Sequence, residues 1–406
     1  MIDENHLYKT IRKIIKEMNE PPLIFLVGGK VRDEYTGKDS NDFDFMIDGE
    51  MDGFVSRFAD AVGSIPRRNK KLMTATFSTE WGQVDFARSR KEKYSLPGSL
   101  PKVEMSKWMD DLKRRDFTMN AMAIPLVYDG WGDLQDPFNG VGDIEKRLIR
   151  MLHANSFRDD PTRILRALRY KTRLGFSIEE NTKIELCRGW KYLSNVSPAR
   201  RLKEWKLICQ EEEVPSILQD IFYFGGWRSF FSNIPYRNMI DAAGIINDIG
   251  KHYGRFRKWI YLLLEILNKS PENLQTISVY WGLSVKEKKE LSETIFLALK
   301  FSEKKINYRA AAYYAKRLPL EGLIYLSHLP EFPFISWQEF RKCIDDFKMP
   351  INGNDLLELG YVQGREIHEK LEILKKLYIE GIFNTKQEGL ILLNKNETGE
   401  NQHGFY

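Results

Sequence analysis

The sequence is poor in the residues that build zinc sites and disulfide frameworks. Its 406 residues include only three cysteines and six histidines. The cysteines Cys187, Cys209 and Cys343 are far apart and match no metal-ligand spacing, and the histidines form no His-Asp or His-x-x-x-His array. These absences argue against a zinc protein and against a disulfide-stapled one. The odd number of cysteines also favours a reducing compartment, so we expect a cytoplasmic protein.

Long apolar runs and a large excess of one charge are also missing. No run approaches the ~20 apolar residues that span a bilayer, so we expect no membrane partner. The N-terminal residues Met1-Ile-Asp-Glu-Asn-His lack the basic-then-apolar order of an export signal. The formal net charge is +5, a mildly basic balance that permits a polyanionic partner without demanding one. The length predicts two to four domains.

The period of the apolar pattern changes near residue 130. A helix is predicted over 5–18, and strand-like runs follow at 23–27, 42–47, 72–78, 83–87 and 122–128. The segment 88–106 is rich in Arg, Lys, Ser, Pro and Gly, and we expect it to be a mobile basic loop. From about residue 141 onward the apolar spacing is almost all helical. We therefore predict an α+β fold, a small head with a mixed or antiparallel sheet followed by an elongated all-α part.

The most informative stretch is residues 26–48. Gly28 and Gly29 follow an apolar run and allow a tight loop whose backbone amides can face a phosphate, with Arg32 one helical turn further on. Asp42 and Asp44 lie in a second apolar run, where a strand would point both to the same face. Neighbouring carboxylates repel unless a cation binds them, and oxygen ligands suit Mg²⁺. This combination is typical of phosphoryl or nucleotidyl transfer. The alternative is an ordinary turn and an exposed strand end.

A second charged cluster lies in residues 111–123. Three consecutive basic side chains, Lys113, Arg114 and Arg115, are flanked by Asp111 and Asp116 beside an apolar run. Such a cluster suits a triphosphate and ribose site that carries its own counter-charges. The alternative is a solvated charge cluster at a helix end.

A third cluster lies in residues 158–170. Asp160-Pro161 favours a helix start, with Asp at the N-cap and Pro at the first helical position, and Arg163, Arg166 and Arg169 recur every three residues along that helix. Arg163 donates hydrogen bonds and Asp160 accepts them, so together they can mimic the Watson–Crick edge of a nucleotide and select a base without a template. Chemistry alone leaves a second interpretation equally open, in which Asp160 only caps the helix and the arginines form a solvated face.

Taken together, these residues resemble the class II tRNA nucleotidyltransferases, the CCA-adding enzymes, and their poly(A) polymerase relatives in the polymerase β superfamily. The resemblance rests on four motifs in order, which are Gly28-Gly29-x-Val31-Arg32-Asp33 with Asp42-x-Asp44, Asp111-x-x-Arg114-Arg115-Asp116-Phe117-Thr118-x-Asn120-Ala121-x-Ala123, Asp136-Pro137-Phe138-x-Gly140, and Asp160-x-x-Arg163-x-x-Arg166-Ala167-x-Arg169. It covers about residues 22–205 and returns more weakly at 352–360. Two departures are Asp159, where the family usually has Glu, and Val362-Gln-Gly-Arg365 in place of a Pro-Gly-Pro in the tail.

The resemblance implies a role for each matching residue. Asp42 and Asp44 would be catalytic and bind Mg²⁺, with Asp85 as a candidate third carboxylate. The implied nucleotide-binding residues are Gly29, Arg32, Arg115, Asp160, Arg163, Arg166 and Arg169. Four domains follow from the same resemblance: a catalytic head at 1–140, a nucleotide-selecting neck at 141–205, an RNA-binding body at 206–330 and a tail at 331–406 that binds the tRNA elbow.

The implied activity is template-free addition of CCA to the 3′ end of tRNA from CTP and ATP, with no DNA partner. The alternatives are a partial enzyme that adds only A or only CC, a poly(A) polymerase, and a non-catalytic RNA-binding relative. The full-length loop at 88–106 argues against CC-only addition, and residues 117–123 are closer to the tRNA-specific branch. The intact Asp42/Asp44 pair argues against loss of catalysis.

Overall fold

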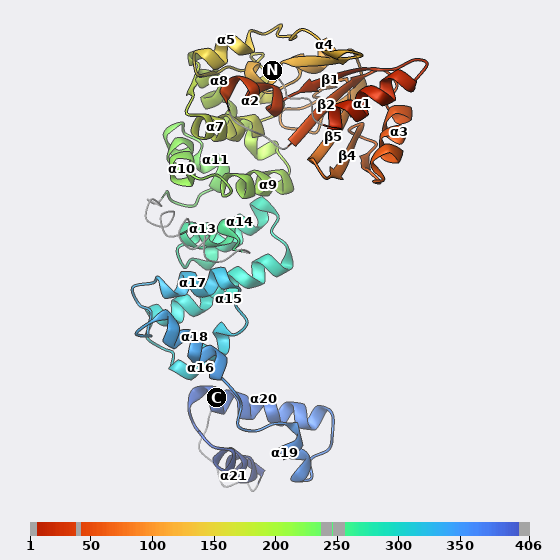
Figure 1. Ribbon diagram of the computed structural model, residues 1–406. Coiled ribbons are helices and arrows are strands. Elements are labelled where there is room, and N and C mark those ends of the chain that lie inside the picture. Colours follow the sequence, from red (N-terminus) through yellow and green to blue (C-terminus); the bar gives the residue numbers. More distant parts are fainter. Residues whose placement is uncertain (1–5, 38–41, 237–245, 247–255, 398–406) are drawn as a thin grey trace. The chain divides into compact units, whose positions relative to one another are not determined.

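The computed structural model of the protein describes residues 6–37, 42–236, 246 and 256–397 (Figure 1). The chain divides into two compact units, residues 1–233 and 234–406, and each is described by itself. The predicted α+β class is confirmed, because strands occur in the first unit and every described element of the second is a helix. The finer division at residues 140, 205 and 330 stays a prediction.

A seven-stranded sheet with the order β3-β4-β5-β2-β1-β8-β9 lies in the first unit. Its strands are β1 (Leu23–Val27), β2 (Asp42–Asp48), β3 (Arg67–Asn69), β4 (Thr74–Thr79), β5 (Gly82–Arg88), β8 (Ala123–Val127) and β9 (Gly130–Trp131). Neighbouring strands are antiparallel except β2 and β5, which are parallel. The sheet is therefore mixed, as predicted, and the strand-like runs at 72–78 and 83–87 correspond to β4 and β5, which form an antiparallel hairpin.

The two faces of this sheet differ because apolar and polar residues alternate along its strands. Phe43 and Phe45 of β2 are buried on one face, where α1 (His6–Glu17) and α3 (Asp52–Val62) cover them. On that face the Phe58 ring of α3 lies edge-on to Phe86 of β5, with ring centroids 4.9 Å apart. The opposite face carries the polar residues of β2, β4 and β5, and this difference leaves one face of the sheet for chemistry.

Short helices complete the first unit around that open face. They are α2 (Gly29–Thr36), α4 (Trp108–Lys113), α5 (Gly140–Glu145), α6 (Ser156–Asp159), α7 (Thr162–Leu174), α8 (Glu180–Gly189), α9 (Pro198–Ile208), α10 (Val214–Tyr223), α11 (Trp227–Phe231) and the 3₁₀ turns η1 (Thr118–Asn120) and η2 (Trp190–Asn195). The glycine that was predicted to end the first of these, Gly37, caps α2 in the left-handed conformation at φ 69°. One small departure is a parallel pair of two-residue strands, β10 (Leu148–Ile149) and β11 (Ser177–Ile178), beyond the point where strands were expected to stop.

The segment at 88–106 differs from the loop that its composition suggested. It contains an antiparallel hairpin of β6 (Arg90–Lys93) and β7 (Lys102–Met105). Opposite charges pair across the two strands, since Glu104 lies 3.4 Å from Lys91 and 3.1 Å from Lys93. The prediction of a basic loop over 88–106 was wrong for the residues of β6 and β7. It rested on composition alone, which does not show that Glu104 of one strand pairs with lysines of the other.

The second unit is an array of helices. They are α13 (Lys258–Leu267), α14 (Pro271–Trp281), α15 (Val285–Ser302), α16 (Tyr308–Ala315), α17 (Leu320–Ser327), α18 (Trp337–Asp346), α19 (Gly353–Glu358), α20 (Arg365–Glu380) and α21 (Lys386–Glu397). A separate apolar cluster near the C-terminus packs Leu356 of α19 against Leu374 of α20 and Phe383. Within the described ranges, no helix combines the length and the hydropathy that crossing a bilayer requires.

Candidate active site

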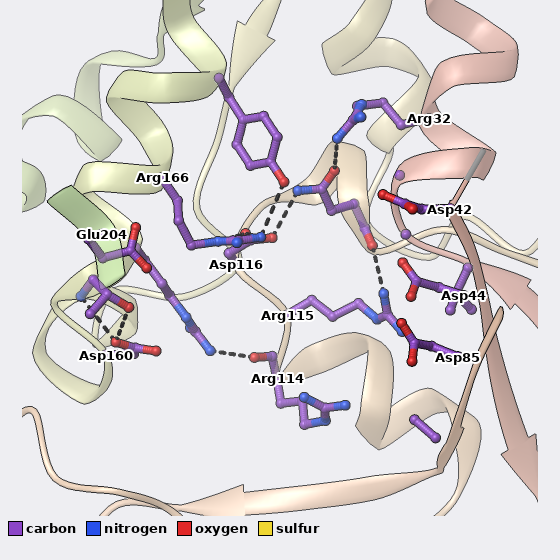
Figure 2. A pocket seen from close by; sticks show the side chains of 18 of the residues that line it. Arg32, Asp42, Asp44, Asp85, Arg114, Arg115, Asp116, Asp160, Arg166 and Glu204 are labelled. Atoms are coloured by element: carbon purple, nitrogen blue, oxygen red, sulfur yellow. Dashed lines mark hydrogen bonds and ion pairs between the residues drawn. The ribbon is translucent and has the colours of Figure 1, made fainter. Parts of the chain in front are cut away.

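A polar cavity of about 820 Å³ opens in the first unit, between the open face of the sheet and helices α7 and α9. Figure 2 shows Asp42, Asp44 and Asp85 on one side and Asp160 and Glu204 on the other, with arginines between them. Of the residues predicted for the site, eight line this cavity: Gly29, Arg32, Asp42, Asp44, Arg115, Asp160, Arg163 and Arg166. One cavity thus joins motifs that are more than a hundred residues apart in the sequence.

The glycine turn lies directly against the carboxylates. Gly28 has φ 73°, a conformation that side chains with a Cβ rarely adopt, and α2 begins at Gly29. A Cβ added at Gly28 would lie 3.2 Å from Asp44 Oδ2 and 3.5 Å from Arg115 Nη1. Glycine is therefore required both by the turn and by this close approach. Gly28 and Gly29 both line the cavity, so the N-terminal end of α2 forms part of its wall.

The three carboxylates Asp42, Asp44 and Asp85 lie close together but differ in their surroundings. Asp42 and Asp44 lie on the same face of β2, and Asp85 of β5 pairs in register with Asp44. Burial raises the pKa of Asp44 to about 6, with Asp85 and Asp42 adding to the increase while Arg115 opposes it. Asp85 already accepts hydrogen bonds from the hydroxyl of Thr76 and from Gln83 Nε2 at 2.7 Å. Negative charge is thus concentrated at Asp44, and a cation there would relieve it.

A divalent cation fits this donor set. In the described part of the chain, no three carboxylate, histidine or cysteine side chains form a preassembled metal cluster. This agrees with the way a small hard cation is usually held at phosphate sites, by one or two carboxylates together with waters and substrate phosphates. Asp42 and Asp44 are the two oxygen ligands that would hold it, and Asp85 stands beside them in a hydrogen-bonded, less available position.

Two arginines border the glycine turn. Arg32 is 5% exposed and donates to Asp33 Oδ1 at 2.8 Å and to Asn120 Oδ1 at 2.9 Å. Arg115 donates to Asp111 Oδ2 at 3.3 Å. These partners hold both guanidinium groups in place beside the glycine turn, where their positive charge favours an anionic ligand.

The buried carboxylate of Asp116 anchors the arginine stripe of α7. It receives hydrogen bonds from Arg166 Nε at 2.8 Å, Asn120 Nδ2 at 3.0 Å and the Phe117 amide at 2.9 Å. Burial alone would raise the pKa of Asp116, but Arg166, Asn120 and Arg163 outweigh it and lower the pKa to about 2. Asp116 therefore stays ionised and locks α7 onto the segment that carries Arg114 and Arg115.

Asp160 and Arg163 lie together at the start of α7, but each already has partners. Asp160 Oδ1 accepts from the Thr162 amide at 3.0 Å and from Arg200 Nη2 at 2.7 Å. Arg163 donates from Nη1 to Ser156 Oγ at 2.8 Å and from Nη2 to the Arg114 carbonyl at 2.5 Å. A guanidinium has five N–H donors, so the remaining ones can still read a base edge. The helix itself begins at Thr162, so the predicted start with Asp160 at the N-cap was early by one residue, although Asp160 caps its amide.

Arg169 is the exception among the predicted residues, because it does not line the cavity. Its Nε donates to Glu211 Oε1 at 2.9 Å, and its Nη1 lies 3.7 Å from Glu204 Oε2. Arg169 thus ties α7 to α9 and to the residues that follow α9. Any support that it gives to the nucleotide site acts through these helices.

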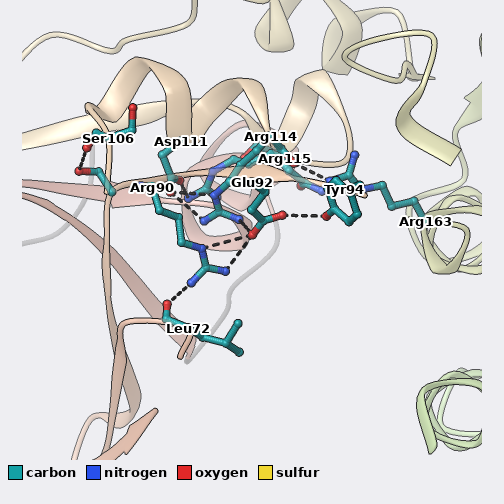
Figure 3. Close-up of polar contacts among 11 residues, drawn as sticks. Leu72, Arg90, Glu92, Tyr94, Ser106, Asp111, Arg114, Arg115 and Arg163 are labelled. Atoms are coloured by element: carbon teal, nitrogen blue, oxygen red, sulfur yellow. Dashed lines mark hydrogen bonds and ion pairs between the residues drawn. The ribbon is translucent and has the colours of Figure 1, made fainter. Parts of the chain in front are cut away.

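The hairpin contributes residues that sequence reasoning missed. Glu92 accepts from Arg90, from Arg114 Nη1 at 3.0 Å and from the Tyr94 hydroxyl at 2.8 Å, and Figure 3 shows this network reaching Arg163 through Arg114. Burial and Glu92 raise the pKa of Tyr94, so it remains a hydroxyl donor. An alternation with a period of two could have revealed these residues, because residues 90, 92 and 94 alternate with the exposed Lys91 and Lys93.

Comparisons with known proteins agree with this geometry. Residues 24–150 match the model of the poly A polymerase head domain family. The A-adding tRNA nucleotidyltransferase of Halalkalibacterium halodurans is 38% identical over 211 residues, which cover 51% of this chain and 49% of that protein. The CCA-adding enzyme of Bacillus velezensis is 26% identical over 88% of this chain and 90% of that protein. A solved CCA-adding enzyme in its apo form superposes with a TM-score of 0.71 at 27% identity, covering 96% of this chain and 95% of that one.

The length of the match differs between relatives. The chain spans about half the length of the H. halodurans protein, whereas it covers most of the B. velezensis enzyme and of the solved structure. The head motifs, the helical second unit and these similarities agree: the chain is similar to the poly A polymerase head domain over residues 24–150 and to CCA-adding enzymes over most of its length.

Proposed function

We propose that the protein adds nucleotides from CTP and ATP to the 3′ end of tRNA, completing CCA without a nucleic-acid template. The observation that carries the proposal is the single cavity that contains the glycine turn, the Asp42/Asp44 pair and the Asp160/Arg163 pair. These three features are the parts that nucleotidyl transfer with protein-directed base choice requires. All of them belong to one compact unit.

Each group has a separate task in this proposal. Asp42 and Asp44 would hold Mg²⁺, which supplies charge neutralisation at the reacting phosphate and favours ionisation of the attacking hydroxyl. Gly29, Arg32 and Arg115 bind the triphosphate and orient its α-phosphorus toward the open face of the sheet. The tRNA 3′-hydroxyl attacks that phosphorus, the bond to the β-phosphate breaks, and pyrophosphate leaves.

Base choice would come from side chains at the start of α7. Asp160 offers an acceptor and Arg163 offers donors, and the exocyclic amino group of C or A requires an acceptor at that edge. Ser156 and the Arg114 carbonyl hold Arg163 beside this site, and small rotations of the two side chains would let the pair recognise both bases. Arg166 and Arg169 support this geometry through Asp116 and Glu211.

The four predicted domains would divide the chemistry and the binding of tRNA between them. The head at 1–140 and neck at 141–205 would perform the chemistry, while the body at 206–330 and tail at 331–406 would hold the acceptor arm and elbow of tRNA by shape and phosphate contacts. None of the three cysteines forms a disulfide, which supports the cytoplasm as the site of action.

A second candidate is addition of A alone. It is favoured by the 38% identity to an A-adding enzyme over 51% of this chain, compared with 26% to the CCA-adding relative over 88% of it. In that case a companion enzyme would supply tRNA that already ends in CC.

One assay separates these functions. Purified protein is given tRNAs that end at the discriminator base, at C or at CC, each with labelled CTP or ATP. CCA addition predicts C incorporation on the first two substrates and A on the third, whereas A addition predicts labelling of the CC end alone. Long A tails would indicate a poly(A) polymerase, and the absence of any incorporation would refute the catalytic proposal.

A further inference from the structure

We propose that the open face of the sheet continues beyond the carboxylates as a binding track for the phosphates of the RNA 3′ strand, ending at Arg67 on edge strand β3. The inference rests on the proposed function, because it concerns the strand that carries the attacking hydroxyl. It extends the site to a part of the head that none of the family motifs includes.

The strand register carries the inference. Asp44 of β2 pairs with Asp85 of β5, Asp85 pairs with Thr76 of β4, and Thr76 pairs with Arg67 of β3. Residues that are directly opposite in neighbouring strands project from the same face of a sheet. Strands are ~4.8 Å apart, so the three steps from Asp44 to Arg67 span about 14 Å. Arg67 therefore belongs to the same polar row as the catalytic carboxylates.

The direction of the reaction selects this side of the site. Gly28 follows β1, which pairs with β2 on the edge opposite to β5. The triphosphate side of the cavity is thus the β1 side, with Arg32 and Arg115. An in-line displacement brings the attacking oxygen from the side opposite to the leaving pyrophosphate. The RNA strand must then approach over β5, and β4 and β3 come next.

The charges at β3 match such a strand. Arg67, Lys70 and Lys71 are exposed and border a hollow of about 380 Å³ that Thr76 and part of Arg68 also line. Among the residues that the structure describes, none of these three cations has an ion-pair partner. Three unneutralised cations beside a hollow form a phosphate-binding surface, and the contact would be independent of base sequence.

Arg68, the neighbour of Arg67 on β3, lies on the opposite face of the sheet. Arg68 pairs with Ala75, which is buried on the α3 side of the sheet, and its guanidinium forms an ion pair with Asp52 of α3. Two adjacent arginines on one short strand therefore have different roles. Arg68 fastens the edge strand to the helix layer, whereas Arg67 is available on the catalytic face.

Three proteins test this inference: the wild type, Arg67→Ala, and Arg57→Ala as a control that removes the same charge. Arg57 is exposed on α3, on the other side of the sheet. The probe is a tRNA that lacks its terminal A, either unmodified or with a neutral methylphosphonate in one of its last three linkages. Binding is measured by fluorescence anisotropy over a salt series, and KM is measured separately for RNA and for ATP.

We expect Arg67→Ala to weaken RNA binding by roughly three- to ten-fold, to raise the KM for RNA by a similar factor, and to leave the KM for ATP unchanged. The slope of log K against log salt should fall by about one. One neutral linkage should weaken the wild type similarly but have little further effect on Arg67→Ala. If Arg67→Ala behaves like Arg57→Ala, or if no linkage shows this coupling, the track does not exist.

The same data separate this inference from the proposed function. A wild-type protein that binds the RNA but transfers no nucleotide would overturn the proposed activity, while the binding constants and salt slopes would still decide the track. A wild-type protein that does not bind the RNA at all would overturn both. Thermal unfolding of each variant confirms that the exposed substitutions have not altered the fold.

Discussion

The ion pair between Asp116 and Arg166 gives the sharpest quantitative prediction. Asp116→Asn keeps the size of the side chain and removes its charge. The carboxylate is buried and receives Arg166 Nε at 2.8 Å and Nη2 at 2.7 Å. The substitution therefore leaves Arg166 without its counter-charge at the point where α7 joins the segment that carries Arg114 and Arg115.

The magnitude follows from the pKa of Asp116. Burial raises it, but Arg166, Asn120 and Arg163 together lower it from 3.8 to about 2. Since each pKa unit is worth ~1.36 kcal/mol, the ionised carboxylate contributes about 2–3 kcal/mol to the free energy of unfolding at neutral pH. At ~2–4 °C per kcal/mol, Asp116→Asn should lower the melting temperature of the first unit by about 5–10 °C.

The pH dependence gives the prediction its sign. The folded-state pKa is lower than the unfolded one, so the contribution is complete above about pH 4 and disappears as the pH falls through 2. Urea unfolding of wild type and Asp116→Asn at several pH values should therefore show a difference that shrinks in acid. Asp133→Asn, an exposed control in the same unit, should change stability by less than about 0.5 kcal/mol. Equal stability of wild type and Asp116→Asn at pH 7 would refute the reasoning.

Three further predictions concern activity. Asp42→Ala should reduce nucleotide transfer by about 10³-fold or more while the tRNA dissociation constant stays within about two-fold, and retained transfer would contradict the metal role. Arg163→Ala should reduce the ratio of kcat/KM between correct and incorrect nucleotides by about ten-fold or more, because it removes charged donors at the base edge; unchanged selectivity would exclude Arg163 from base choice. Gly28→Ala should lower kcat sharply because the added Cβ would lie 3.2 Å from Asp44 Oδ2. The control, Gly37→Ala, has a similar backbone strain at φ 69° but no atom within 4 Å of the added Cβ, so it should only reduce stability. Equal losses of kcat in both variants would count against the proposed clash.

The sheet and the cavity were predictable from sequence because their signals are local. Alternating apolar residues predicted β1, β2, β4, β5 and β8 to within two residues. The carboxylates of β2 share a face by strand geometry alone. Local periodicity therefore sufficed for these strands, and the order of the motifs sufficed for the motif residues that line the cavity, but not for Glu92 and Tyr94.

Contacts between charged side chains were not predictable in the same way. Glu92 meets Arg114 across 22 residues, and Arg169 meets Glu211 across 42, and neither separation has a periodic signal. The position of Arg169 follows from helix geometry, since a step of three residues turns ~60° short of a full revolution. Over two steps Arg169 points about a third of a turn away from Arg163, toward α9 and the residues after it.

The bond from Arg163 to the carbonyl oxygen of residue 114 has a consequence for mutational scanning. Every amino acid supplies that oxygen, so substitutions at Arg114 will report only the loss of its own guanidinium contacts with Glu92 and Asp111. The hydrogen bond that holds Arg163 in place is invisible to such a screen. Only changes that displace the peptide group of residue 114 would reveal this hydrogen bond. The side chain at position 114 can therefore change during evolution without breaking it.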